Sequence, residues 1–101
     1  MKTARIRTKS GIVDAEQIAT FTHTVGGYVY RFLITRQDLQ APVVTHRDSG
    51  MAVAHLSAVR KPTVEDAKKA IDEKVTKHGA ARVRVVLDSA PTIAMHDIRA
   101  R

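Results

Sequence analysis

The chain has 101 residues, of which 44% are hydrophobic and 27% are charged, with 17 lysines and arginines against 10 acidic residues. This length favours one domain, and the composition is that of an ordinary globular protein, which argues against wholesale disorder. The sequence contains no cysteine, so disulfides, thiolate metal sites and cysteine nucleophiles are excluded.

The distribution of charge along the chain is uneven. The formal net charge is +7, whereas the acidic and basic side chains of residues 64–79 balance. The excess positive charge therefore lies elsewhere, where it either attracts a polyanion or serves solubility. Residues 1–9 lack the apolar segment of a secretory signal, and no apolar run approaches the ~20 residues of a membrane span. We therefore expect a cytoplasmic protein that does not contact a membrane.

The first predicted element is a strand over residues 3–9. Basic side chains alternate there with small or apolar ones, which is typical of a half-buried strand. The basic positions are Arg5, Arg7 and Lys9. Residues 12–19 are ambiguous, because Asp14 with Gln17 three residues later would cap one helical turn, whereas the stretch also reads as extended.

Two apolar and aromatic stretches, residues 18–25 and 28–35, flank a pair of glycines. This pattern predicts a two-residue hairpin turn with positive φ at Gly26 and Gly27. Pairing of Val25 with Tyr28 would give one aromatic and aliphatic face and one face rich in threonine. The first face would carry Ala19, Phe21, His23, Val25, Tyr28, Tyr30, Phe32 and Ile34. The second would carry Thr20, Thr22, Thr24, Val29, Arg31 and Leu33.

The aromatic face has two interpretations, a base-stacking platform or a hydrophobic core. Against the stacking motif of RRM domains, residues 27–33 differ at Val29, Arg31 and Leu33, and an RRM has a helix between its first two strands. The chain contains only four aromatic residues with which to build a core. We therefore interpret the aromatic face as core.

A second hairpin is predicted over residues 42–56. The stretches 42–46 and 51–56 flank a turn in which Gly50 suits the left-handed position. Pro42 would begin the first of these strands, where its missing N–H does least harm.

A helix is predicted next, over residues 63–79. Thr63 is a suitable N-cap, Asp66 completes a variant of the capping box, and Gly79 ends the helix. Its apolar positions recur at helical spacing as a narrow stripe, which favours packing against a sheet. These positions are Val64, Ala67, Ile71 and Val75.

Residues 81–87 alternate again and predict a last strand, with Val83, Val85 and Leu87 on one side and Arg82 and Arg84 on the other. We expect the following residues, 90–101, to form a flexible or docking tail. Its apolar side chains are Ile93, Met95 and Ile98.

The order of elements, β-ββ-ββ-α-β, predicts a single α+β domain over residues 1–101. We expect an antiparallel β-sheet of about five strands with a single α-helix packed on one face, because a domain packs in layers around one core. The other face would then meet water or a partner. If the first and last strands share this sheet with their apolar sides inward, six cations project from the outer face. They are Arg5, Arg7, Lys9, Arg31, Arg82 and Arg84.

These patterns predict a small non-catalytic binding module that binds nucleic acid, DNA or RNA, electrostatically through the basic outer face. The alternative is a protein-binding accessory or inhibitor protein, of a type found in phages and mobile elements, that uses a sheet edge or the C-terminal tail. Either function is compatible with a homodimer. We expect no cofactor and no metal, since the five histidines lack metal-ligand spacing. No serine lies in a G-x-S-x-G setting, so we do not expect an enzyme.

Overall fold

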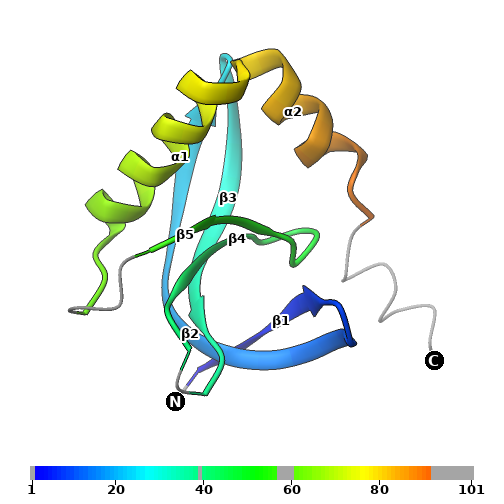
Figure 1. The fold of residues 1–101 in the computed structure, drawn as a ribbon, viewed down its shortest axis with the longest axis vertical. Coiled ribbons are helices and arrows are strands. Elements are labelled where there is room, and N and C mark those ends of the chain that lie inside the picture. The colour runs from blue at the N-terminus through cyan, green and yellow to red at the C-terminus, as the bar shows by residue number, and fades with distance from the viewer. Residues whose placement is uncertain (1, 39, 57–60, 92–101) are drawn as a thin grey trace.

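In the computed structural model, residues 2–38, 40–56 and 61–91 are described, and they form a five-stranded antiparallel sheet followed by two helices (Figure 1). The elements are β1 (Thr3–Thr8), β2 (Gly11–Val25), β3 (Tyr28–Arg36), β4 (Val43–His46), β5 (Ala52–His55), α1 (Val64–His78) and α2 (Ala80–Ser89). The strands follow one another across the sheet in the order of the chain. The α+β class with an antiparallel sheet is therefore confirmed, whereas the prediction of a single helix is wrong.

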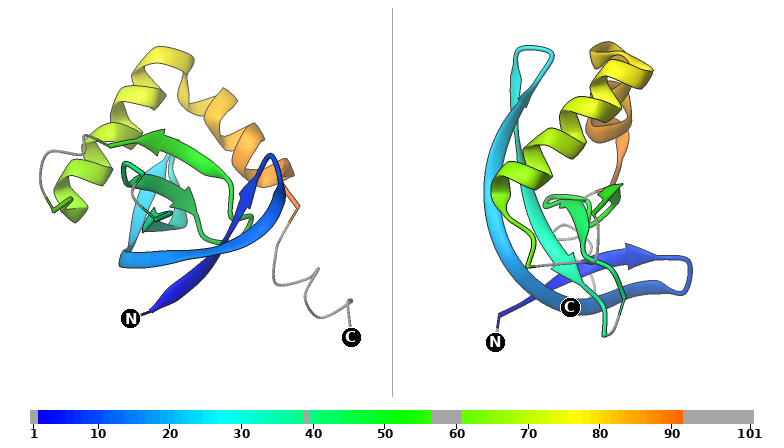
Figure 2. Two further views of the ribbon diagram at one scale, coloured as in Figure 1. Left: turned by 60° about the horizontal axis from the view of Figure 1, so that its bottom comes forward. Right: turned by 60° about the vertical axis from the view of Figure 1, so that its left-hand side comes forward.

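The long strand β2 gives the sheet its shape. It continues through residues 12–19, which are therefore extended rather than helical. Its pairing with β3 shifts between Gln17 and Ala19, and such a bulge lets a strand bend. Figure 2 shows that β2 curves strongly. At the far end of this curve, the backbone N–H of Arg7 in β1 donates to the carbonyl oxygen of Gly50 at 2.8 Å, which ties β1 to the β4–β5 turn.

The first hairpin has the predicted register and turn. The pairs are Val25 with Tyr28, His23 with Tyr30, Phe21 with Phe32, and Ala19 with Ile34. Gly26 and Gly27 have φ values of 57° and 85°. These values fit a type I′ turn, whose twist matches that of the flanking strands.

The aromatic face of this hairpin is the core, as predicted. The buried cluster contains Val25, Phe32, Ile34, Val44, Ala54, Ala67, Ile71 and Leu87. The rings of Phe21 and Phe32 stack with their centroids 5.6 Å apart. Tyr28, next to the turn, is the exception, since it remains 57% exposed. Phe21 and Tyr30 are partly buried and pack against this cluster, so most of the aromatic surface of this face belongs to the core.

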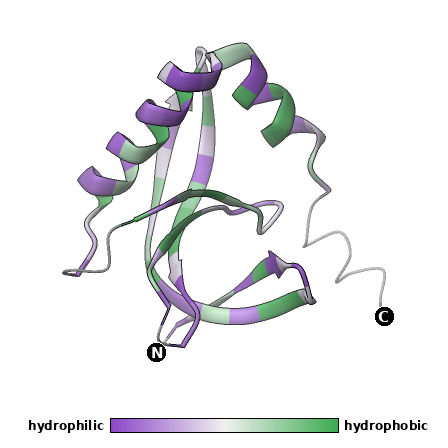
Figure 3. Cartoon of the chain, in the orientation of Figure 1, coloured by the Kyte–Doolittle hydropathy of each residue, from purple (hydrophilic) through white to green (hydrophobic). Residues whose placement is uncertain are grey.

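The predicted helix forms as α1, with the predicted ends. Thr63 Oγ1 accepts a hydrogen bond from the backbone N–H of Asp66 at 3.1 Å, and Asp66 Oδ2 accepts one from the N–H of Thr63 at 3.1 Å. At the other end, Gly79 has a φ of 89° and donates its N–H to the carbonyl oxygen of Val75. Figure 3 shows the hydrophilic outer side of α1.

The predicted last strand is wrong, because residues 80–89 form α2. Val83 and Leu87 lie one helical turn apart and both contact the core, so the alternation that predicted a strand also satisfies helical spacing. Valine lowers helix propensity by only about 0.5 kcal/mol per residue, and burial of the Leu87 side chain contributes ~2 kcal/mol in the opposite direction. Figure 1 shows α1 and α2 meeting at an angle above the sheet, with the single residue Gly79 between them.

The second face of the sheet is not wholly open, contrary to the prediction. Leu33, Thr35 and Thr45 belong to this face, and each is at most 3% exposed. The curled sheet brings Ile6 of β1 to the same small cavity that Thr35 and Thr45 line. The hydroxyl groups of Thr35 and Thr45 share a hydrogen bond of 2.9 Å, which satisfies them in this buried position. Nearer the turn, the three threonines of β2 are exposed as predicted.

The predicted docking tail falls mostly outside the described residues, which end at Pro91. The role proposed for Ile93, Met95 and Ile98 therefore lies outside the part of the chain that the structure describes.

Candidate functional site

β1 presents its predicted cations on the side opposite Ile6, but they have different surroundings. Arg5 is exposed and lies directly opposite Asp14 in the register with β2, and Lys9 is exposed in the turn that follows β1. Arg7 is half-buried. Its Nε donates to the carbonyl oxygen of Ser49 at 3.3 Å, and its Nη2 donates to that of Pro91 at 3.3 Å. Arg7 therefore links β1 to the β4–β5 turn and to Pro91, which follows α2.

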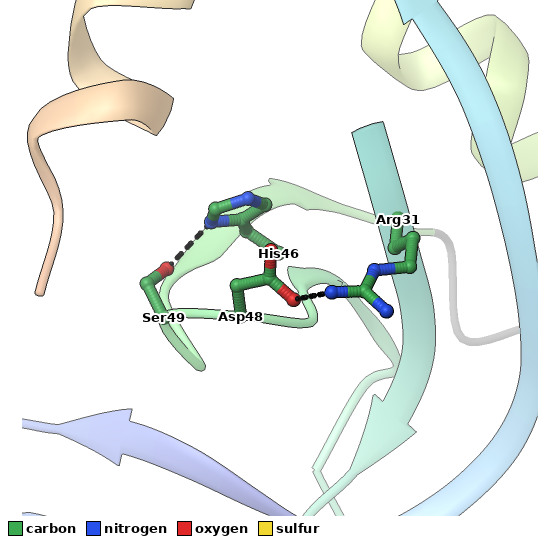
Figure 4. A network of polar contacts seen from close by, with 4 residues as sticks. All are labelled: Arg31, His46, Asp48 and Ser49. Carbon is green, nitrogen blue, oxygen red and sulfur yellow. Dashed lines mark hydrogen bonds and ion pairs between the residues drawn. The ribbon is translucent and has the colours of Figure 1, made fainter. Parts of the chain in front are cut away.

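Arg31 on β3 is exposed and is paired with an acid. Its Nη2 donates to Asp48 Oδ1 at 2.8 Å, as Figure 4 shows. Asp48 belongs to the same β4–β5 turn that Arg7 contacts. The turn therefore engages two of the six predicted cations and neutralises part of their charge.

The same turn contains a histidine and a serine in contact. His46 Nδ1 lies 2.8 Å from Ser49 Oγ (Figure 4). Ser49 Oγ also accepts a hydrogen bond from the backbone N–H of Met51. Burial lowers the pKa of His46, which favours the neutral imidazole. Ser49 is fully buried. A substrate has no access to its hydroxyl group, so the pair holds the turn and is not a nucleophilic site.

The two arginines predicted on a last strand lie on α2 instead. The Cζ atom of Arg84 is 3.6 Å from the centroid of the Tyr28 ring, and a hydrogen bond with Tyr30 raises the pKa of Arg84. Arg82 is exposed on another side of the same helix, beside α1 residues that include His78. The six predicted cations are thus divided among β1, β3 and α2, and they do not form one sheet face.

A groove runs between β5 and the two helices. Its first part, of about 560 Å³, is lined by the four residues of β5 and by Ala70, Glu73, Lys74 and Lys77 of α1. Its second part, of about 290 Å³, has an apolar lining made of Met51, Val53, Val83, Val86 and Leu87. Ala52, Val53 and Lys74 line both parts, so the groove is continuous along β5.

The outer edge of β5 borders this groove. β5 is the last strand of the sheet, so its outer edge has no strand partner within the described residues. The N–H of Leu56 donates to the carbonyl oxygen of Pro42 at 3.0 Å. Because hydrogen-bonded and non-hydrogen-bonded pairs alternate in an antiparallel ladder, the N–H and C=O groups of the preceding His55 point away from β4. His55 also lines the groove, which places these backbone groups beside it.

The two edges of the sheet therefore differ. At the β1 edge, the backbone N–H of Arg7 is already bonded to Gly50. At the β5 edge, the described residues leave a groove of about 560 Å³ beside the strand. Sequence analysis named a sheet edge only as an alternative. It missed the groove because Lys74 and Lys77 belong to residues 64–79, whose charges balance in the sequence.

Comparisons with protein-family models, with curated proteins and with solved structures found no match. Among the described residues, no three histidine or acidic side chains form a group that could hold a metal ion. Neither helix in that part of the chain is long and apolar enough to cross a membrane. The function is therefore inferred from the geometry of this chain alone.

Proposed function

We propose that this protein is a non-catalytic binding module that binds an extended segment of a partner protein along the edge of β5. The observation that supports the proposal is the coincidence of an unpaired strand edge with a groove of about 560 Å³ beside it. An added strand gains main-chain hydrogen bonds from such an edge, and its alternate side chains enter the adjoining groove.

The dimensions suit a short segment. β5 has four residues, and at ~3.3 Å per residue an added strand of similar length spans about 13 Å. So short an edge offers few backbone hydrogen bonds, and the two helices must contribute the remaining contacts. The wall formed by α1 is already held in place, since Ile71 is buried and His23 Nε2 lies 2.7 Å from Asp72 Oδ1. A preformed wall lowers the cost of ordering on binding.

The composition of β5 is consistent with a functional edge. Proteins commonly protect exposed edges with lysine, proline or covering elements. Residues 52–55 include neither lysine nor proline. The register shift between Val44 and Thr45 does interrupt the regular ladder of β4 and β5. An irregular edge pairs less readily with an arbitrary strand. The side chains that line the groove would therefore select the partner.

The test begins with selection of extended peptides from a random display library. We expect a selected peptide to slow amide exchange at residues 52–55 and to shift their NMR signals together with those of the α1 residues that line the groove. His55→Pro removes an outward N–H without removing a ladder bond to β4, and it should abolish binding. His55→Ala is the matched control, because it keeps the N–H and should keep binding.

A second measurement covers the case in which His55→Pro perturbs the fold. Methylation of alternate backbone nitrogens in the selected peptide should abolish its binding to the unaltered protein, since an added strand needs those donors. Peptides that map to another surface, or that tolerate methylation at every position, would exclude strand addition.

A second candidate function, nucleic-acid binding, is favoured by the net charge of +7 together with two exposed cations, Arg5 on β1 and Lys9 in the turn that follows it. Replacing both by Gln should reduce the slope of log K against log salt by about 1.8 on duplex DNA, at about 0.9 per phosphate contact. The matched control is Lys68→Gln with Lys69→Gln on α1. Equal losses would indicate diffuse attraction, and no binding at about 50 mM salt would exclude this function.

A further inference from the structure

The second part of the groove has room for a bulky apolar side chain. Its lining joins Met51 and Val53, at the start of β5, to Val83 and Val86 of α2 within a volume of about 290 Å³. A cavity of ~150 Å³ is enough to hold benzene, so one leucine or phenylalanine side chain fits here. Val86 is 46% exposed, and burial in the fold does not account for an apolar residue at this position.

The groove is also positively charged, although α1 as a whole is neutral. The described residues that line it include three cations, Lys74, Lys77 and Arg82, and one carboxylate, that of Glu73. The other acidic residues of α1 lie outside this lining. Asp66 caps the helix and Asp72 contacts His23 on β2. The fold therefore separates the charges of α1 and leaves its groove side basic.

This charge decides between three occupants of the groove. The side chains of residues 92–101 include two arginines and one aspartate, so their net charge has the same sign as that of the groove. Pairing of β5 with β5 of a second copy would bring two basic grooves together. An acidic segment of a partner protein is the occupant with complementary charge.

We infer that the segment bound along β5 is acidic, with one bulky apolar side chain in the part of the groove lined by Val83 and Val86 and carboxylates beside Lys74 and Lys77. This inference rests on the strand addition proposed above. Side chains at alternate positions of a strand share one face. An added strand antiparallel to β5, like every other neighbouring pair in the sheet, runs from His55 towards Met51. Its pattern is then acidic-x-acidic-x-apolar.

The test uses three synthetic peptides and calorimetry at physiological salt. The first is acetyl-Thr-Glu-Thr-Glu-Thr-Leu-amide, the second has lysine in place of both glutamates, and the third has alanine in place of leucine. We expect the first to bind, and its binding to be lost in His55→Pro. The lysine peptide should bind at least tenfold more weakly because its charge opposes that of the groove. The alanine peptide should also bind about tenfold more weakly, because most of the apolar contact is gone.

Matched protein variants separate the groove from the general positive charge. Lys74→Glu with Lys77→Glu should reverse the preference between the glutamate and lysine peptides. Lys68→Glu with Lys69→Glu changes the same charge on the same helix outside the groove lining, and the preference should persist.

Three outcomes would overturn the inference. If the glutamate and lysine peptides bind equally, and both lose binding in His55→Pro, strand addition stands and the acidic preference is wrong. Equal weakening by the two pairs of lysine variants would indicate diffuse attraction. If none of the three peptides binds while the display library yields other segments that depend on His55, the pattern assigned here is wrong and the proposed function remains.

Discussion

The guanidinium carbon of Arg84 lies 3.6 Å from the centre of the Tyr28 ring, so a cation–π contact joins α2 to the first hairpin. A second contact follows one turn later in the helix, where Asp88 Oδ1 accepts a hydrogen bond from the Tyr30 hydroxyl group at 2.7 Å. Gly26 admits the arginine, because a Cβ atom built there would lie 2.8 Å from Arg84 Cδ. The hairpin turn and α2 therefore fit each other closely.

This fit predicts different costs for two adjacent substitutions. Gly26 and Gly27 both have positive φ, so alanine at either position is strained by about 1–2 kcal/mol. Gly26→Ala also displaces Arg84 from Tyr28, whereas a Cβ at Gly27 meets no atom within 4 Å. We expect urea denaturation to show the larger loss of stability for Gly26→Ala. Equal losses would mean that Arg84 moves aside without cost.

Phe32→Ala tests the assignment of the aromatic face as core. Phe32 is 0% exposed, so its truncation should lower the free energy of unfolding by about 3–5 kcal/mol. Val29→Ala is the control on the same strand, since Val29 is 68% exposed and should change stability by less than about 0.5 kcal/mol. Chemical denaturation measures both. A Phe32→Ala variant of normal stability would contradict the core assignment.

The burial of His46 predicts that the folded protein loses stability in mild acid. Burial lowers its pKa below the ordinary value of 6.5, and the charges of Asp48 and Asp88 oppose this shift only in part. The unfolded chain therefore binds a proton near pH 6.5 that the folded chain binds only at lower pH. Stability is fully present above this range and falls as the pH drops through 6.5 towards the folded pKa.

Thermal unfolding between about pH 7.5 and 5 checks the His46 prediction. His46→Gln cannot take up the proton, so its melting temperature should decline less over this range than that of the unaltered protein. A decline of the same size in both proteins would assign the effect to other groups.

We predict that the phenol group of Tyr30 loses its proton at a higher pH than an ordinary tyrosine. Burial and the hydrogen bond to Asp88 raise the pKa of Tyr30 above 10.0, although Arg84 acts in the opposite direction. In a Tyr28→Phe background, where Tyr30 is the remaining tyrosine, ultraviolet absorbance should give a midpoint above 10.0. Adding Asp88→Asn should move the midpoint down, because a neutral amide no longer disfavours the phenolate. An unchanged midpoint would show that Asp88 does not act on this hydroxyl group.

The elements that could be predicted from the amino-acid sequence are those whose geometry is set by neighbouring residues. The glycine pair at 26 and 27 sets the turn, and a two-residue turn sets the whole register of β2 with β3. Gly50 acts in the same way for the second hairpin, and Thr63 with Asp66 sets the start of α1. In each case, residues close together in the chain satisfy one backbone geometry, so no distant contact is needed to choose it.

The other elements depend on contacts between residues that are distant in the chain. The alternation of residues 81–87 fits a strand and a helix equally well, and packing of Leu87 against the core selects the helix. That choice moves Arg82 and Arg84 from the sheet to α2 and divides the predicted basic face. It also completes the groove, whose walls come from β5, α1 and α2. These walls are distant in the sequence, and a hydrophobic pattern specifies which side of each element is buried but not which elements meet.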